Sequence, residues 1–164
     1  MTTNTKGYFK SVDAIGVEGS HELKFQFNPT TISEKRGAVF NLSEAQGQWL
    51  PLVQFGRFEP IEISFTLFLF SHNGIEDQIK SVRRLVSPRR LDELTYYEQV
   101  APLVYQLGLG GIGVYQGVVQ SINITHQQYS KQTLTPIHAE VEVSFVAVSE
   151  SVQGDVQFYN STTR

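Results

Sequence analysis

Long runs of alternating apolar and polar residues constrain this chain more than any other feature. Residues 61–69 carry Ile, Ile, Phe, Leu and Leu at every second position, and residues 137–147 repeat the rule with Ile, Ala, Val, Val, Phe and Ala. Shorter runs lie in residues 23–27, where Leu, Phe and Phe share a face, and in residues 118–125. Because side chains alternate between the two faces of a strand, each run predicts a strand with one buried face. The chain is therefore predicted to be mainly antiparallel β.

The segment from 75 to 86 is the one strongly helical part of the sequence. Its apolar residues recur at i, i+4, i+7 and i+11, as Ile75, Ile79, Val82 and Val86. Asn73 is predicted to cap the N-terminus, with Glu76 completing a capping box. Arg83 and Arg84 fall in the predicted last turn, where the helix dipole favours cations. The expected fold class is thus mainly β with one packed helix (α+β).

Weaker patterns complete the expected organisation. Residues 33–57 are interpreted as an extended arm or hairpin that contains an apolar cluster around Trp49 and Phe55. Strands 118–125 and 137–147 are predicted to form a long hairpin, and Val118, Gln120, Ile122 and Ile124 are assigned to one face of the first of them. A helical turn over 91–99 and a buried strand over 103–107 are also expected.

Composition allows one folded domain and disfavours several function classes. With 164 residues, 40% of them apolar, we expect a single domain over residues 1–164, with a core from about 8 to 150 and flexible termini. The net charge of −3 supplies no positive field for nucleic-acid binding. Charged residues reach only 18%, below the typical share of about 25%, which fits a surface partly covered by other chains.

The absence of cysteine excludes a disulfide framework, a thiolate nucleophile and a Cys-ligated metal. The first ten residues lack the apolar stretch of a signal peptide, and no apolar run approaches the roughly 20 residues that span a bilayer. We therefore expect a soluble chain that is made in a cytoplasm and does not insert into membranes.

Motifs that carry chemistry are weak in this sequence. Residues 108–113 match the G-x-G-x-x-G pattern, but a strand is predicted to follow instead of a helix, so the interpretation is a flexible connection or a close backbone approach. His21, His72, His126 and His138 lack metal-ligand spacing. No residues converge on a catalytic arrangement. We expect no catalytic, cofactor-binding or metal-binding residues.

Two strands have apolar residues on the face that is otherwise polar. These residues are Phe68 and Phe70 in one strand and Val146 and Val148 in the other. Either a second layer of the same chain covers them, most simply the helix 75–86, or another protomer does.

The order of these features resembles the tube-type proteins of contractile injection systems and contractile phage tails. The likeness is greatest to the baseplate tube adapters, or tube initiators, that often carry a LysM domain. Residues 23–33 resemble the family's opening strand and its F-x-F-N-P-x-x-I-S turn, through Phe25, Phe27, Asn28 and Pro29. The strand 58–70, the helix, and the segments 102–105, 117–119 and 135–141 then follow in the family's order. After residue 105 the chain departs from the family, because Gln-Leu-Gly replaces a common Trp-Gly pair.

The resemblance implies a structural protein, not an enzyme, with an antiparallel β-sandwich or barrel of the tail-tube type. Six copies would close a ring at the baseplate end of a virion tail or injection particle, assembled in a bacterial cytoplasm. The ring would join the tube protein to spike and hub proteins. DNA or protein cargo would pass a lumen lined by Lys24, Glu62, Ser64, Thr66, Asn123, Glu140 and Glu142. Subunit contacts are expected at Trp49, Phe55, Phe68, Phe70, Arg83 and Arg84.

Two alternatives stay open. A repeating inner tube subunit has the same sequence features and would polymerise alone. A monomeric β-sandwich that binds a small ligand or glycan through aromatic residues, such as Tyr96, Tyr97 and Tyr105, fits the alternation equally well. Oligomeric state separates these readings.

Overall fold

The computed structural model describes residues 6–12, 21–44, 47, 49–87 and 103–151. The elements in these residues are β1 (Tyr8–Ser11), β2 (Glu22–Lys24), β3 (Ile32–Lys35), β4 (Ala38–Ser43), β5 (Leu52–Phe58), β6 (Ile61–Phe70), α1 (Glu76–Arg84), β7 (Tyr105–Gly108), β8 (Val114–Tyr129) and β9 (Pro136–Ser151). The predicted fold class, mainly antiparallel β with one helix, is confirmed. The predicted helical turn over 91–99 and both chain ends lie outside the described residues.

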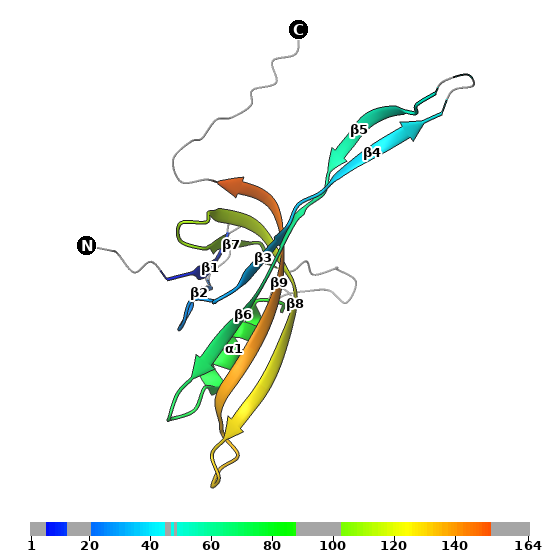
Figure 1. Ribbon diagram of the computed structural model, residues 1–164. Coiled ribbons are helices and arrows are strands. Elements are labelled where there is room, and N and C mark those ends of the chain that lie inside the picture. The colour runs from blue at the N-terminus through cyan, green and yellow to red at the C-terminus, as the bar shows by residue number, and fades with distance from the viewer. Residues whose placement is uncertain (1–5, 13–20, 45–46, 48, 88–102, 152–164) are drawn as a thin grey trace, which may run out of the picture.

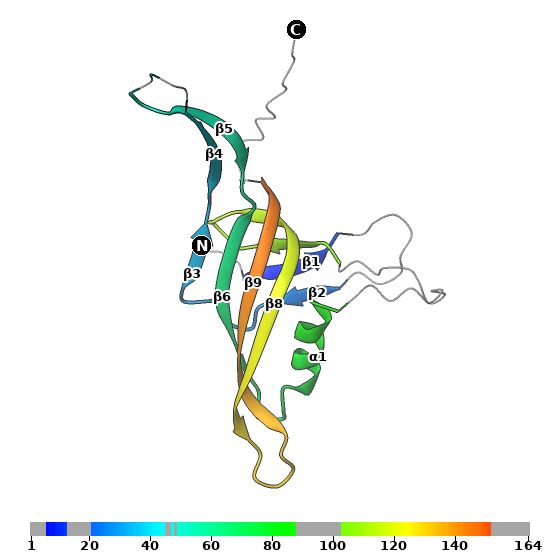
Figure 2. The same cartoon turned by 90° about the vertical axis from the view of Figure 1, so that its right-hand side faces the viewer.

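One sheet holds seven of these strands in the order β2-β1-β7-β8-β9-β6-β3, while β4 and β5 pair only with each other. β8 and β9 form the predicted long hairpin, with 16 residues in each strand. In Figure 2, strands β6, β9 and β8 lie side by side as one layer, and β1, β2, β7 and α1 lie on a single side of that layer. The alternating burial of β6 places its apolar residues on this covered side.

The sheet bends so strongly that distant strands meet across the core. Phe9 of β1 stacks on Phe65 of β6 with ring centroids 6.1 Å apart, and Phe25 lies 5.6 Å from Phe65. Tyr105 and Phe145 also contact the Phe9 ring. The expected sandwich or barrel is corrected here, because the described strands form an open, bent sheet. Its edges are β2, with three residues, and β3, with four, and these short strands do not pair with each other.

α1 packs on the covered side through buried apolar residues, which are Ile75, Ile79, Val82 and Leu85. Arg83 and Arg84 occupy its last turn, as predicted. The prediction that Asn73 caps the helix is wrong, because Ile75 holds the N-cap position and no side chain caps it. The chain reverses just before, where Gly74 has a φ of 101°. The Ile75 N–H then donates to the carbonyl oxygen of Pro136 at 3.1 Å, which ties the helix start to β9.

A β-bulge in β8 corrects one assignment of faces. The pairing register with β9 shifts between Val119 and Ser121. Val119 is therefore buried, Ile122 and Ile124 pack against the core, and Gln120 is exposed. One extra residue in a strand moves every later side chain to the opposite face of the sheet. Val118 and Gln120 therefore do not share the core face with Ile122.

The glycine-rich residues 108–113 form the tight connection between β7 and β8. The Leu109 N–H donates to the carbonyl oxygen of Gly113 at 3.0 Å, and Gly110 has a φ of 61°. β8 follows directly, so the pattern precedes a strand, as predicted, and not the helix N-terminus that binds phosphate. The buried strand expected over 103–107 corresponds to β7.

Candidate assembly surfaces

The β4–β5 hairpin, called the arm below, projects away from the sheet (Figure 1). It confirms the hairpin predicted within residues 33–57. Its exposed large apolar residues are Phe40, Leu42, Trp49, Leu50, Leu52, Val53, Phe55 and Phe58. Trp49 is 96% exposed, and Phe55 is 53% exposed although its ring contacts Phe40 and Phe58. A lone hairpin is marginally stable in water, and apolar surface on this scale indicates an interaction site.

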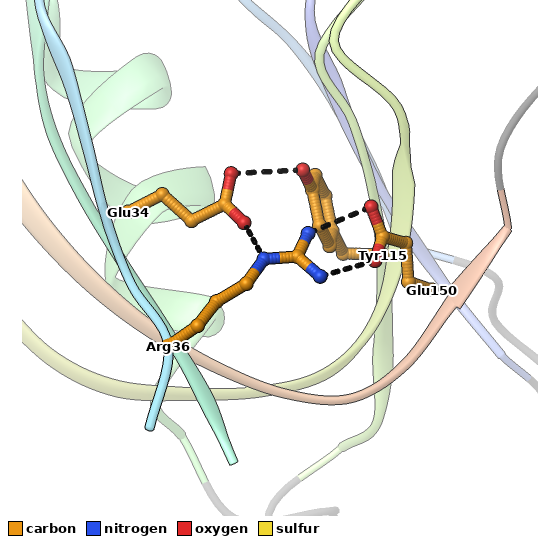
Figure 3. Close-up of polar contacts among 4 residues, drawn as sticks. All are labelled: Glu34, Arg36, Tyr115 and Glu150. Atoms are coloured by element: carbon orange, nitrogen blue, oxygen red, sulfur yellow. Dashed lines mark hydrogen bonds and ion pairs between the residues drawn. The ribbon is translucent and has the colours of Figure 1, made fainter. Parts of the chain in front are cut away.

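Four polar side chains, called the Arg36 cluster, join the base of the arm to the sheet (Figure 3). Arg36 lies between β3 and β4, and both of its terminal nitrogens lie 2.8 Å from the carboxylate of Glu150 on β9. Its Nε donates to Glu34, and the Tyr115 hydroxyl donates to the other oxygen of Glu34 at 3.2 Å. Hydrogen bonds to Glu150 and Glu34 raise the pKa of Arg36, and burial raises the pKa of Tyr115. The cluster therefore fixes the direction in which the chain enters the arm.

The side of the β6–β9–β8 layer that faces away from α1 is called the polar face. Register places Thr66 and Asn123 on either side of Glu142, and the Asn123 amide donates to that carboxylate at 3.2 Å. Six of the seven residues expected to line a lumen lie here, which are Glu62, Ser64, Thr66, Asn123, Glu140 and Glu142. Lys24 does not, because β2 is the far edge of the sheet and its amine lies 3.6 Å from Glu22.

Phe68 and Phe70 also lie on the polar face, so the interpretation that α1 covers them is wrong. α1 packs on the opposite side, against the buried residues of β6. Phe68 is half-buried, and Phe70 is 37% exposed with its ring 4.9 Å from that of His72. Val148 is 75% exposed at the other end of this face. Burial of these residues by another protomer is the interpretation that stays open.

The turn after β2 holds two distant strands in place. Phe25 is buried, and the Asn28 side-chain oxygen accepts a bond from the Gly7 N–H at 2.9 Å. The Gln26 amide bonds both backbone groups of Phe70, donating to its carbonyl oxygen at 2.6 Å and accepting from its N–H at 2.9 Å. Phe27 was expected on the same face as Phe25 but is 50% exposed, because the chain bends after β2. Pro29 lines a small cavity of about 180 Å³ beside this turn.

A groove of about 350 Å³, called the α1 groove, separates the helix from the end of the β8–β9 hairpin. It is lined by Glu76, Ile79, Lys80, Arg83, His126, Tyr129 and Pro136. Sequence reasoning missed this groove and the Arg36 cluster. Glu34 and Arg36 are two positions apart in the sequence, which places their side chains on one face of an extended segment. This spacing was the signal from which their contact could have been predicted.

Within the described ranges, no helix is long and apolar enough to cross a bilayer. Nor do three His, Cys, Asp or Glu side chains gather there as metal ligands.

Comparison with known families decides the class of this protein. A family model described as contractile injection system tube protein matches residues 8–154. The chain belongs to this family. A search of curated proteins found no match. Tube proteins are structural and are not known as enzymes, and they assemble with themselves and with other components of a tail or injection particle.

Proposed function

We propose that this tube protein forms a ring of six copies at the baseplate end of the tube, where it joins the tube to spike and hub proteins. One observation carries the proposal. Among the described residues, the β6–β9–β8 layer is covered by its own chain on one side, open and polar on the other, and unpaired along parts of both edges.

The two open edges belong to different strands. β7 pairs with β8 only at Val114–Gly117, so in the described chain residues 118–129 pair only with β9. On the other side of the layer, β3 pairs with β6 only as far as Phe65, and Gln26 then bonds Phe70. Residues 66–69 have no strand partner on that side among the described residues. Open edges join neighbouring chains unless they are blunted. A contact between unlike edges is heterologous, and such contacts close into rings when the rotation allows.

The polar face would then line the lumen of the ring. Its six predicted residues include Glu62, Glu140 and Glu142, and only Glu62 has a described cationic partner, Lys35 at 3.2 Å. An acidic wall repels phosphate, and the exposed apolar side chains Phe70 and Val148 lie toward the two ends of the face, which limits trapping of cargo. This lining suits the passage of DNA or a protein without specific binding.

The remaining expected contacts would lie between subunits. Trp49 and Phe55 would anchor the arm on an adjacent subunit or ring, because buried aromatic side chains dominate binding energy at interfaces. A neighbouring protomer would cover Phe68 and Phe70. Arg83 and Arg84, both exposed, would form salt bridges to a neighbour.

The test is the mass of the full chain in solution across a range of concentrations, followed by negative-stain imaging. Closed rings near six copies that bind tube or hub proteins at one end support the proposal. Long tubes formed by this chain alone would assign it to the repeating tube subunit. A strict monomer, with and without tube or hub proteins, would overturn the ring.

The arm is tested by deleting residues 47–55. We expect a folded chain that fails to assemble, because the deletion removes the tip and most of β5. The control is Leu134→Ser, which removes another exposed apolar side chain, 76% exposed, from the turn between β8 and β9. Normal assembly of the deletion variant would remove the arm from the account.

The repeating inner tube subunit is the second candidate, and one observation favours it. The arm and the β8–β9 turn lie at opposite ends of the molecule in both views (Figures 1 and 2), and residues at the end of the β8–β9 hairpin line the α1 groove. Surfaces placed in this way can meet when identical rings stack in one direction.

The glycan-binding alternative loses one of its residues. Tyr105 is fully buried, and its hydroxyl donates to the Arg84 carbonyl oxygen at 3.3 Å. Tyr96 and Tyr97 lie outside the described residues.

A further inference from the structure

The arm joins the sheet through a short neck, formed by residues 36–37 before β4 and residues 59–60 after β5. The Glu59 N–H donates to the carbonyl oxygen of Gly37 at 2.9 Å, so the two sides of the neck stay together. β4 and β5 pair only with each other, and none of their apolar side chains belongs to the described core or packs against it. Within the described chain, neither strand pairing nor apolar packing therefore fixes the angle between the arm and the sheet.

The Arg36 cluster supplies polar contacts that do fix this angle. Arg36 uses all three of its guanidinium nitrogens, two on Glu150 at 2.8 Å and the third on Glu34 (Figure 3). The Tyr115 hydroxyl bonds the other carboxylate oxygen of Glu34 at 3.2 Å. A planar guanidinium that is held by two carboxylates in this way has one orientation. The cluster thus connects the neck to β3, β8 and β9.

The exposure of the three charged groups allows the cluster to open. The side chains of Glu34 and Glu150 are 27% and 21% exposed, and that of Arg36 is 51% exposed. Both carboxylates accept from the same guanidinium, so its withdrawal would leave two partly covered like charges beside each other, which favours the closed cluster. Water and competing groups reach the half-exposed guanidinium, and this limits the strength of the ion pairs. The cluster can therefore open without unfolding of the sheet.

Glu150 lies at the end of β9, where this strand has left β6. The pairing of β9 with β6 ends at Ala147, and residues 148–151 pair only with β8 in the described chain. Val148, two positions before Glu150, is 75% exposed. A neighbouring protomer that covers Val148 would therefore contact the strand end that holds Arg36.

We propose that Arg36 is a latch that holds the arm in one direction and couples this direction to the end of β9. A displacement of Glu150 opens the latch, and the arm then swings about the neck. A strand of seven residues, such as β5, spans about 23 Å, so a swing of about 20° moves the tip by about 8 Å. The latch acts within one copy and needs no ring. Its use in assembly, as pre-organisation of the arm for a neighbour, rests on the proposed function.

Pulsed electron paramagnetic resonance on the full chain measures the direction of the arm. The sequence has no cysteine, so Ser43→Cys at the end of β4 and Ser121→Cys on β8 place one spin label on the arm and one on the sheet, both at exposed positions. An excess of unlabelled chain restricts the measured distances to those within one copy. All samples also carry Trp49→Ser, which removes the proposed anchor of the arm and, because Trp49 is 96% exposed, leaves the fold intact.

Two variants open the latch from its two ends. Arg36→Lys keeps the charge but cannot bond two carboxylates through a planar fork. Glu150→Gln removes the charge on the β9 side. We expect each to broaden the distribution of label distances by about 8 Å, the displacement of the tip for a 20° swing. The matched control is Lys35→Met, which removes the neighbouring cation and its ion pair with Glu62 at 3.2 Å inside the β3–β6 pair, and should leave the width unchanged.

Each outcome of the distance measurement decides the inference. Broadening in both latch variants, with the control unchanged, supports it. Equal widths in all chains overturn the latch. Broadening in Arg36→Lys and not in Glu150→Gln overturns the coupling to β9. Broadening in Lys35→Met as well would assign the direction of the arm to the charge of the whole neck and overturn the role of Arg36.

The solution mass of chains that retain Trp49 separates the latch from its use in assembly. If the latch pre-organises the arm, Arg36→Lys should raise the concentration needed for ring formation, and Lys35→Met should not. Rings that form at the same concentration in Arg36→Lys overturn the use of the latch in assembly. A chain that never forms rings overturns the proposed function, and the label distances still decide the latch.

Discussion

Replacement of Gly117 by alanine tests the packing of β8 against β9 at a second register shift, which lies between Gln116 and Gly117. A Cβ at this position would lie 1.9 Å from the carbonyl oxygen of Val146 and 2.7 Å from the Cα of Ala147. Real Cβ atoms essentially never approach closer than 3.0 Å. The two strand backbones must therefore separate by about 1 Å, and β7 on the other side of Gly117 leaves β8 little freedom to retreat.

Overpacking costs about 1–3 kcal/mol, and a backbone contact belongs at the upper end of that range. For a chain of this length, about 3 kcal/mol lowers the melting temperature by about 6–12 °C. Thermal unfolding of Gly117→Ala, followed by circular dichroism in dilute solution, measures the shift. The control is Gly111→Ala, where a Cβ meets nothing within 4 Å, and about 0.5 kcal/mol or less is expected. Equal melting temperatures for the two variants would refute the pairing of Gly117 with Ala147.

Three further predictions concern single polar groups. Burial, together with the charge of Arg84, lowers the pKa of His21 below 6.5. The unfolded chain therefore binds more protons than the folded chain, and the free energy of unfolding falls as the pH drops through about 6.5. His21→Gln should reduce this dependence on pH, as measured by urea titrations at several pH values. Gln26→Ala removes both bonds to the Phe70 backbone and should cost about 1–2 kcal/mol in urea unfolding, whereas an unchanged midpoint would mean that these bonds form no part of the edge. Arg36→Met should cost up to about 1 kcal/mol in low salt, because the guanidinium is half exposed, and a cost that persists in about 1 M salt would contradict an electrostatic role.

The elements that could be predicted are those whose signal is local. The alternation in β6 and β9 and the apolar stripe of α1 depend on neighbouring residues along the chain, and both appear where the period places them. The cap of α1 was missed because Gly74 and the bond from Ile75 to Pro136 set the helix start. The bulge in β8 was missed because its partner strand decides it, and a shift of one residue moves each later side chain to the other face.

The assembly surfaces divide in the same way. The arm was predictable, because residues 33–57 contain apolar residues that do not fit the alternating pattern of the predicted sheet strands. The Arg36 cluster was not, because Arg36 and Glu150 are 114 positions apart and meet only when β3 and β9 are placed in the sheet. His126 and Arg83 likewise face one groove only after α1 has packed beside the β8–β9 hairpin.

A reconstruction of the assembled particle by electron cryomicroscopy, at a resolution that traces strands, tests the central claim most directly. The account predicts that the polar face, identified by Glu142 and Asn123, points to the ring axis and that the arm is buried between chains. A ring with α1 lining the lumen and the polar face directed outward, or with the arm free in solvent, would contradict it.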